Sequence, residues 1–168
     1  MQVRHRFNHD ASLDRVVAVM FATAFQRIIY MCNIHGLLIS LLQVREILLA
    51  PIRSILNEFA LTEQQWRIIS ALANDDTVGL GPGQIAKQCC ILHPSLTGIL
   101  SRLERDGVVT REISNIDSRR QLIKLTARGR RLFLTINERM EVRYRLIEEV
   151  YGHENLQNVL TALHGLKD

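Results

Sequence analysis

The chain is poor in cysteine and lacks the cysteine spacing of a disulfide framework. Its 168 residues include three cysteines, Cys32, Cys89 and Cys90, which is an odd number with two members adjacent. Secreted disulfide scaffolds usually carry an even number of cysteines at regular spacings. This class is therefore disfavoured, and we expect a protein of a reducing compartment, the cytoplasm.

The N-terminal part also lacks an apolar run long enough to cross a bilayer. The run at residues 16–25 follows a short basic segment at residues 4–6, and residues 22–24 (Ala-Thr-Ala) resemble a signal cleavage site. However, Asp10 and Asp14 interrupt the approach, and a spanning helix needs about 20 apolar residues. We expect neither a signal peptide nor a membrane partner.

The motifs on which most enzymes depend are missing as well. The sequence has no glycine-rich phosphate loop and no nucleophile paired with a base. Cys89, Cys90 and His93 lie close together, but their spacing is poor for a metal site and no further ligands follow. We expect a protein that is not an enzyme and that needs no cofactor or metal.

Lysine is scarce relative to arginine. Lysine accounts for three of the 21 basic residues, at Lys87, Lys124 and Lys167, and the formal net charge is +4. Guanidinium groups bind phosphates and base edges through two parallel hydrogen bonds, whereas ammonium groups act as point charges. The imbalance is a weak indication of nucleic-acid binding. The hydrophobic share of 47% is large enough for a packed core.

Hydrophobic spacing predicts a mainly α chain with a small β-hairpin. A helix is expected over residues 12–31, and a second over 35–59, where Pro51 should kink or restart it. The remaining elements are expected as helices over 62–74, 82–89 and 94–107, strands over 108–113 and 121–125, and helices over 127–151 and 153–166.

The start of the helix over 62–74 is marked by its sequence. Thr62 and Gln65 have the spacing of a capping box, in which each side chain binds the backbone amide of the other residue. Leu61 and Trp66 flank this box as a hydrophobic staple. We therefore expect a well-defined helix start at Thr62.

Two short helices followed by a hairpin have the order of a winged helix-turn-helix. A recognition helix must show small polar side chains and arginine to base edges in the major groove, while its other side packs on the domain. The helix over 94–107 meets this demand, and its glycine allows close approach. The predicted DNA-binding residues on it are Ser95, Thr97, Gly98, Ser101 and Arg102.

The predicted hairpin supplies the wing. A wing needs a cation that can enter the narrow minor groove, where negative potential is focused. Arg119 is the candidate, Arg120 follows it, and Asp117 precedes Arg119 by two residues on a turn, where it can hold the guanidinium. A helix pair or an Asp-x-Arg-Arg string alone is usually ordinary packing or solvated surface. Together and at this spacing they favour DNA binding.

Two other interpretations remain open. A winged helix can serve as a protein-interaction module without DNA, although the polar helix face and the arginines of the hairpin argue against this. Alternatively, Cys89 or Cys90 at the turn of the motif could sense redox state, because oxidation there would disturb the recognition helix. The default is one cysteine in the core and one inert thiol.

Residues Leu61–Gly129 resemble the MarR family of transcriptional regulators. The match includes RLERDGVVTR at 102–111, the Asp-x-Arg-Arg string at 117–120 and LTARG at 125–129. Over about 42–107, the strings LLQVRE, LTEQQWRI and CILHPSLTGILSRLERDG are similar to a subgroup that represses homoprotocatechuate (hydroxyphenylacetate) degradation. The resemblance predicts a repressor of an aromatic-acid catabolic operon.

The resemblance implies a homodimer with interlocked N- and C-terminal helices. Residues 35–60 would form one dimerisation helix and 127–168 the C-terminal dimerisation helices, on either side of a winged helix-turn-helix at 61–126. Residues 1–34 form an N-terminal extension longer than the family's lead-in. Each winged domain would bind half of a pseudo-palindromic operator, with Asp117 positioning Arg119.

The resemblance also implies an effector, a small aromatic carboxylate that binds between the dimer helices and the winged domain and releases DNA. Arg45 lies on the apolar stripe of its helix, and burying an unpaired guanidinium costs on the order of several kcal/mol. Its partner is either a carboxylate, such as Glu46, Glu58 or one from the other subunit, or the effector. Trp66 and Arg67 would complete the pocket, unless Trp66 is a staple and core residue.

Overall fold

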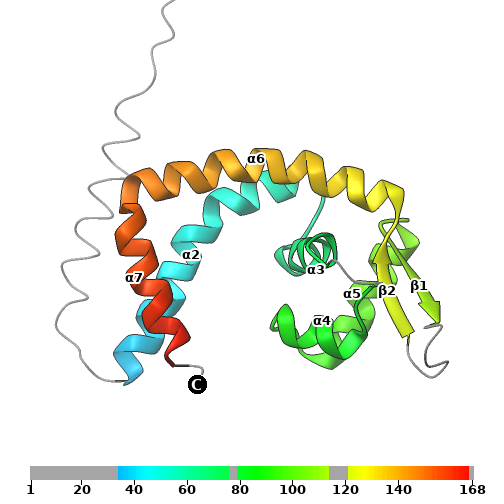
Figure 1. The fold of residues 1–168 in the computed structure, drawn as a ribbon, viewed down its shortest axis with the longest axis horizontal. Coiled ribbons are helices and arrows are strands. Elements are labelled where there is room, and N and C mark those ends of the chain that lie inside the picture. The colour runs from blue at the N-terminus through cyan, green and yellow to red at the C-terminus, as the bar shows by residue number, and fades with distance from the viewer. Residues whose placement is uncertain (1–33, 76–78, 114–120, 167–168) are drawn as a thin grey trace, which may run out of the picture. The chain divides into compact units, whose positions relative to one another are not determined.

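The computed structural model describes residues 34–75, 79–113 and 121–166 (Figure 1). The chain divides into two units, residues 1–47 and 48–168, and each is considered by itself. The helix expected over residues 12–31 lies outside the described residues. The elements predicted from about residue 35 onward are all present, with bounds that differ by at most two residues.

Helix α2 extends from Ile34 to Glu58 and is continuous through Pro51, so the helix does not restart there. By length and composition alone it could cross a membrane. Its last turns, however, bury Ile52, Ile55 and Leu56 in the core of the second unit. The last turns of α2 therefore form part of the protein core.

Helix α3 extends from Glu63 to Ala73 and begins as its sequence predicts. The Thr62 hydroxyl accepts a hydrogen bond from the Gln65 amide at 3.2 Å, and the Gln65 side chain accepts one from the Thr62 amide at 2.8 Å. Both bonds satisfy amides that have no partner within the helix. The predicted capping box is confirmed.

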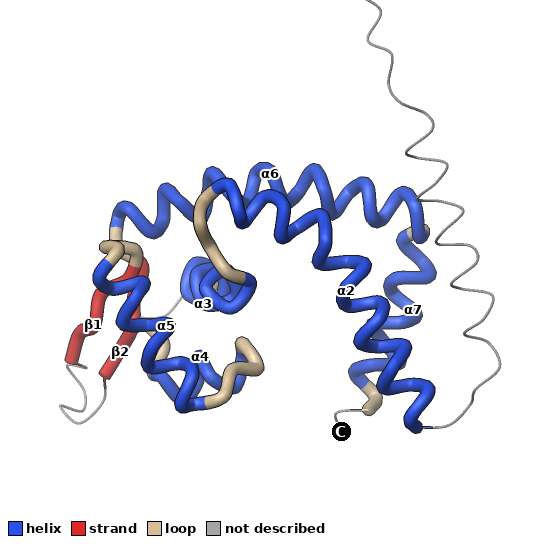
Figure 2. The backbone as a smooth tube through the Cα atoms, turned by 180° about the vertical axis from the view of Figure 1, so that it is seen from behind, coloured by secondary structure: helices blue, strands red, loops and turns tan. Residues whose placement is uncertain are grey.

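The helix-turn-helix consists of α4 (Pro82–Gln88) and α5 (His93–Arg105), and the hairpin of β1 (Val109–Ile113) and β2 (Gln121–Leu125). The strands are antiparallel, with Val109 opposite Leu125 and Ile113 opposite Gln121. An isolated antiparallel bridge also joins Leu80 to Ile123 of β2. Figure 2 shows α3 enclosed by α4, α5 and α6, all of which it contacts.

The core of the second unit collects apolar side chains from every helix except α7. Leu96, Leu100 and Leu103 of α5 are buried, so one side of this helix packs on the domain as predicted. The sheet contributes Val109 and Ile123. The largest fully buried side chains are Leu56, Ile68, Ile69, Ile85, Leu96, Leu103, Ile123, Ile136 and Met140.

Helix α6 (Ala127–Tyr151) begins where the hairpin ends. Thr126 caps it by accepting from the Gly129 amide at 3.0 Å, and its hydroxyl donates to the Gly107 carbonyl at 2.6 Å. A Cβ on Gly129 would lie 2.1 Å from the Val108 carbonyl oxygen. The LTARG string thus supplies a helix cap and the space that lets α6 approach the start of β1.

Helices α6 and α7 (His153–His164) leave apolar side chains uncovered. No residue of α7 is buried: Leu156 and Leu163 are half-buried, and Val159 and Leu160 are exposed. Helix α6 adds further exposed side chains: Leu134, Val142, Tyr144, Leu146 and Val150. Apolar area of this kind is typical of a protein–protein contact surface.

Candidate nucleic-acid interface

Helix α5 packs one side on the domain and exposes the other, as a recognition helix must. Its start carries Pro94 in the first turn, and its end is followed by Gly107 with φ of +68°, a conformation that glycine adopts without strain. One side is buried in the core. All five predicted DNA-binding residues of this helix are exposed: Ser95, Thr97, Gly98, Ser101 and Arg102.

Gly98 stands in the interior of α5 although the fold does not require a glycine there. A Cβ at this position would meet no atom within 4 Å, and Gly98 is exposed. Glycine in a helix interior costs about 0.5–1 kcal/mol relative to alanine. The absent side chain therefore favours close approach of another molecule to α5.

Gly98→Ala should change stability and DNA binding in opposite directions. We expect unfolding free energy to rise by about 0.5–1 kcal/mol, because alanine favours the helix and clashes with nothing. Affinity for operator DNA should fall by about 1–3 kcal/mol, because a methyl group is forced into a close-packed interface. Thermal unfolding and fluorescence anisotropy measure the two effects.

Gly83 of α4 provides the matched control. It is also exposed, and a Cβ added to it would meet no atom within 4 Å. Gly83→Ala should leave the preference for operator over scrambled duplex unchanged. Equal operator affinity of Gly98→Ala and the unmodified protein would remove Gly98 from the interface.

The turn between α4 and α5 holds both cysteines in different environments. Cys89 is buried and caps α4, and Cys90 is exposed with φ of +49°. Burial raises the pKa of the Cys89 thiol, and the nearby Arg67 guanidinium only partly offsets this. A buried thiol that resists ionisation is a poor redox sensor. The redox interpretation is therefore not favoured for Cys89.

Arg67 secures the same turn from α3. Its Nη1 donates to the Cys89 carbonyl at 2.6 Å, so it satisfies a carbonyl at the C-terminal end of α4. The sequence predicts only an effector contact for Arg67, because no local pattern indicates a hydrogen-bond partner 22 residues away. The hydrogen bond gives it a structural role in the helix-turn-helix, and its effector role stays a prediction.

Trp66 lies in the core. It is 7% exposed, and its ring stacks on that of Phe133 from α6 with centroids 5.6 Å apart and an angle of 17° between planes. The interpretation of Trp66 as a core residue is confirmed. A ligand that also uses Trp66 would have to reach one edge of this ring pair.

Arg45 is paired within its own helix. Its Nη1 lies 2.6 Å from Glu46 Oε1, and the two side chains are 47% and 53% exposed. Glu46 is one of the structural partners that the sequence suggests. The sequence predicts that Arg45 is buried, but it is about half exposed in the single chain. The free-energy cost of removing its guanidinium from water, which would require a partner, is therefore small here.

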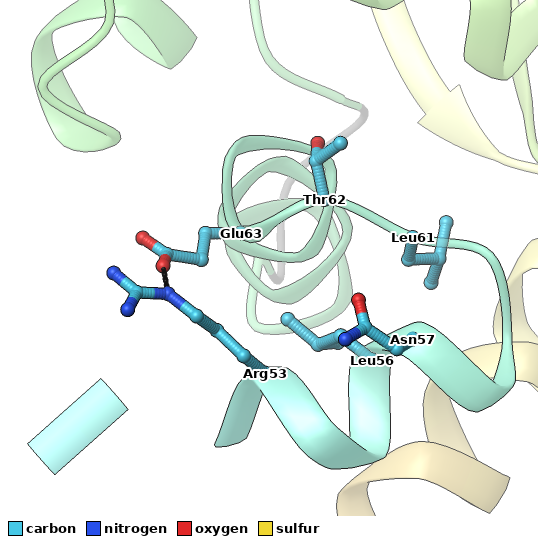
Figure 3. A pocket seen from close by; sticks show the side chains of 6 residues that line it. All are labelled: Arg53, Leu56, Asn57, Leu61, Thr62 and Glu63. Atoms are coloured by element: carbon cyan, nitrogen blue, oxygen red, sulfur yellow. Dashed lines mark hydrogen bonds and ion pairs between the residues drawn. The ribbon is translucent and has the colours of Figure 1, made fainter. Parts of the chain in front are cut away.

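A pocket of about 320 Å³ lies where α2 meets α3 (Figure 3). Its polar lining includes an ion pair between Arg53 and Glu63, with Asn57 and Thr62 nearby. None of the predicted effector residues lines it. Because Glu63 already neutralises Arg53, an anion entering this pocket would compete with a carboxylate.

The wing is described only at its base. Strands β1 and β2 frame it as predicted, but Asp117, Arg119 and Arg120 lie outside the described residues. Their roles stay predictions. Among the described residues, no group of three or more His, Cys, Asp or Glu side chains could hold a metal ion.

Arg111 of β1 is a candidate site residue that the sequence alone does not indicate. Its guanidinium contacts Ser101 and Glu104 of α5 and Gln121 of β2. The string RLERDGVVTR contains two of these residues, Glu104 and Arg111, but only the folded hairpin brings Arg111 back against α5. The spacing of these residues in the sequence does not indicate the contact, because the contact depends on how the hairpin packs on α5.

Comparisons with known proteins agree with this architecture. Residues 61–120 match the MarR family. The HTH-type transcriptional regulator FarR of Neisseria gonorrhoeae is 45% identical over 77% of this chain and 90% of its own length. The homoprotocatechuate degradative operon repressor of Escherichia coli is 42% identical over 76% of this chain and 85% of its own length.

A solved structure of similar sequence is that of NadR in complex with 4-hydroxyphenylacetate. It is 44% identical, covers 82% of this chain and 94% of its own, and has a TM-score of 0.70. The predicted similarity to a repressor of homoprotocatechuate degradation is thus confirmed, and both curated relatives are named as transcriptional regulators or repressors. The chain belongs to the MarR family of transcriptional regulators, whose members bind operator DNA as dimers.

Proposed function

We propose that the protein is a cytoplasmic repressor of an operon for aromatic-acid catabolism, released from its operator by a hydroxylated phenylacetate. The observation that carries the DNA-binding part is the exposed face of α5, with small polar side chains around Gly98. The effector part is supported by the homoprotocatechuate repressor and by NadR, which was crystallised with 4-hydroxyphenylacetate.

Helix α5 enters the major groove in this proposal. Ser95, Thr97, Ser101 and Arg102 face the base edges, where hydroxyl and guanidinium groups distinguish base pairs through hydrogen bonds. The wing supplies Arg119 to the adjacent minor groove, held by Asp117, and Arg120 contributes to the backbone contact. No metal or cofactor takes part.

The repressor acts as a homodimer. Its support is the uncovered apolar area on α6 and α7, together with exposed Leu37, Leu38, Leu41 and Leu42 on the first half of α2. Burying such area in a second copy removes it from water at about 25 cal/mol per Å². Two winged domains in one dimer then bind the two halves of a pseudo-palindrome.

The DNA-binding proposal is tested with the protein's own upstream region. A labelled duplex of that region and a scrambled duplex of equal composition are titrated with the protein at constant salt. We expect the upstream duplex to bind at least about 1,000-fold more tightly, as specific recognition does. Equal binding of the two duplexes would leave an interaction module as the better interpretation.

Arg45→Met tests the effector site, because methionine keeps the bulk of the stem and removes the charge. We expect the variant to fold, bind the upstream duplex and fail to respond to 4-hydroxyphenylacetate. Since Arg45 and Glu46 are both about half exposed, losing their ion pair should cost no more than about 1 kcal/mol. A stable variant with an unchanged effector titration would remove Arg45 from the site.

A further inference from the structure

We infer that Arg111 is a positioning residue for DNA recognition, which ties the wing to α5 and directs the hydroxyl proton of Ser101 outward. The inference rests on the proposed function, because it assumes that α5 meets the major groove. Four side chains from three elements carry it: Arg111 of β1, Ser101 and Glu104 of α5, and Gln121 of β2.

The guanidinium of Arg111 makes contacts in three directions. Its Nη2 donates to Ser101 Oγ at 3.3 Å and its Nη1 to Gln121 Oε1 at 3.5 Å. Its Nε lies 2.9 Å from Glu104 Oε2, as an ion pair in which the N–H does not point straight at the oxygen. The side chain is 24% exposed, and a planar fork can hold three partners at once where an ammonium cannot.

The contact with Arg111 determines the direction in which the Ser101 hydroxyl donates its proton. A serine hydroxyl has one proton and two acceptor lone pairs, whereas a guanidinium can only donate. Arg111 therefore occupies a lone pair of Ser101 Oγ, and the hydroxyl proton turns away from the cation. Because Ser101 is exposed, it presents a donor that fits an acceptor on a base edge, such as guanine O6 or thymine O4.

Arg111 also removes an electrostatic obstacle. Glu104 lies three residues after Ser101 on α5, hence on a neighbouring part of the same face, and its side chain is 43% exposed. An unpaired carboxylate there would repel DNA phosphates. The ion pair with Arg111 neutralises it.

The contact with Gln121 links the two DNA-binding elements. Gln121 is the first residue of β2 and directly follows Arg120 of the wing. One guanidinium thus connects the helix assigned to the major groove with the strand that leaves the wing. Its loss should disturb the positions of both elements while removing no predicted contact to DNA.

The first test separates positioning from direct phosphate binding. Arg111→Met is titrated on the upstream duplex and on the scrambled duplex over a series of salt concentrations. We expect about tenfold or greater loss on the upstream duplex and a clearly smaller loss on the scrambled duplex, where only the repulsion by the unpaired Glu104 carboxylate acts. The salt slope should change by less than about one, because no phosphate contact is removed. A slope lower by about one, with equal loss on both duplexes, would mean that Arg111 binds a phosphate and would overturn the inference.

The second test uses Arg111→Lys, which keeps the charge and protects the fold if Arg111→Met fails to fold. Each base pair of the upstream duplex is substituted in turn, and the affinities of Ser101→Ala and Arg111→Lys are compared with that of the unmodified protein. We expect both variants to lose discrimination at the same base pair. Arg130→Lys, an exposed position on α6, is the control and should retain it.

Full discrimination at that base pair in Arg111→Lys would overturn the inference while leaving the proposed function intact. If instead the unmodified protein does not prefer the upstream duplex, the proposed function fails, and the inference fails with it. The two failures are therefore distinguishable in one set of titrations.

Discussion

Gly129→Ala is expected to destabilise the protein by about 3 kcal/mol or more, because its methyl group would lie 2.1 Å from the Val108 carbonyl oxygen. The obstructing atom belongs to the backbone, so no side-chain rotation can relieve the clash. Either α6 or the start of β1 must shift, which disturbs the Thr126 cap as well. For a chain of this length, the melting temperature should fall by roughly 6–12 °C at constant protein concentration.

Gly98→Ala is the matched control for this prediction, because the same methyl group enters open space in a helix. The two glycine variants should therefore shift the melting temperature in opposite directions. A Gly129→Ala protein as stable as the unmodified one would contradict the close packing of α6 against Val108.

Arg119→Ala should weaken operator binding by about 1–3 kcal/mol, because it removes the cation proposed for the minor groove. The salt dependence should also become shallower, since fewer counterions are released. Asp117→Ala should weaken binding too, although it removes a negative charge, because Arg119 loses the carboxylate that orients it.

The sign of the Asp117→Ala effect decides between two accounts. Simple charge counting predicts tighter binding, and orientation of Arg119 predicts weaker binding. Anisotropy titrations of both variants and their double mutant measure the coupling. Tighter binding by Asp117→Ala would show that Asp117 does not position Arg119.

Much of the fold could be predicted because its signals are local. The capping box of Thr62 and Gln65 and the packing of one side of α5 on the domain each depend on residues close together in the sequence, and both are present as predicted. The effect of Pro51 could not be predicted from the sequence. A proline removes only one helical hydrogen bond, and the surrounding packing decides whether the helix continues. In this chain α2 continues.

The site could be predicted only in part, because its decisive contacts connect distant segments. The exposed face of α5 follows from helical periodicity, which assigns Gly98, Ser101 and Arg102 to the side opposite the core. Ser95 and Thr97 lie at the two margins of this face. The partner of Arg67 lies 22 residues away in the sequence, and those of Arg111 lie seven and ten residues away. Periodicity carries no information about such contacts.

The most direct test of the proposed function is operator affinity with and without 4-hydroxyphenylacetate. The labelled upstream duplex is titrated with the protein, by anisotropy at constant salt, in the absence and in the presence of a saturating concentration of the acid. An effector can shift the equilibrium only through its different affinity for the two states, and such coupling is typically about 1–3 kcal/mol. We therefore predict a dissociation constant about 5- to 150-fold higher with the acid, and an unchanged dissociation constant at saturating acid would contradict the account.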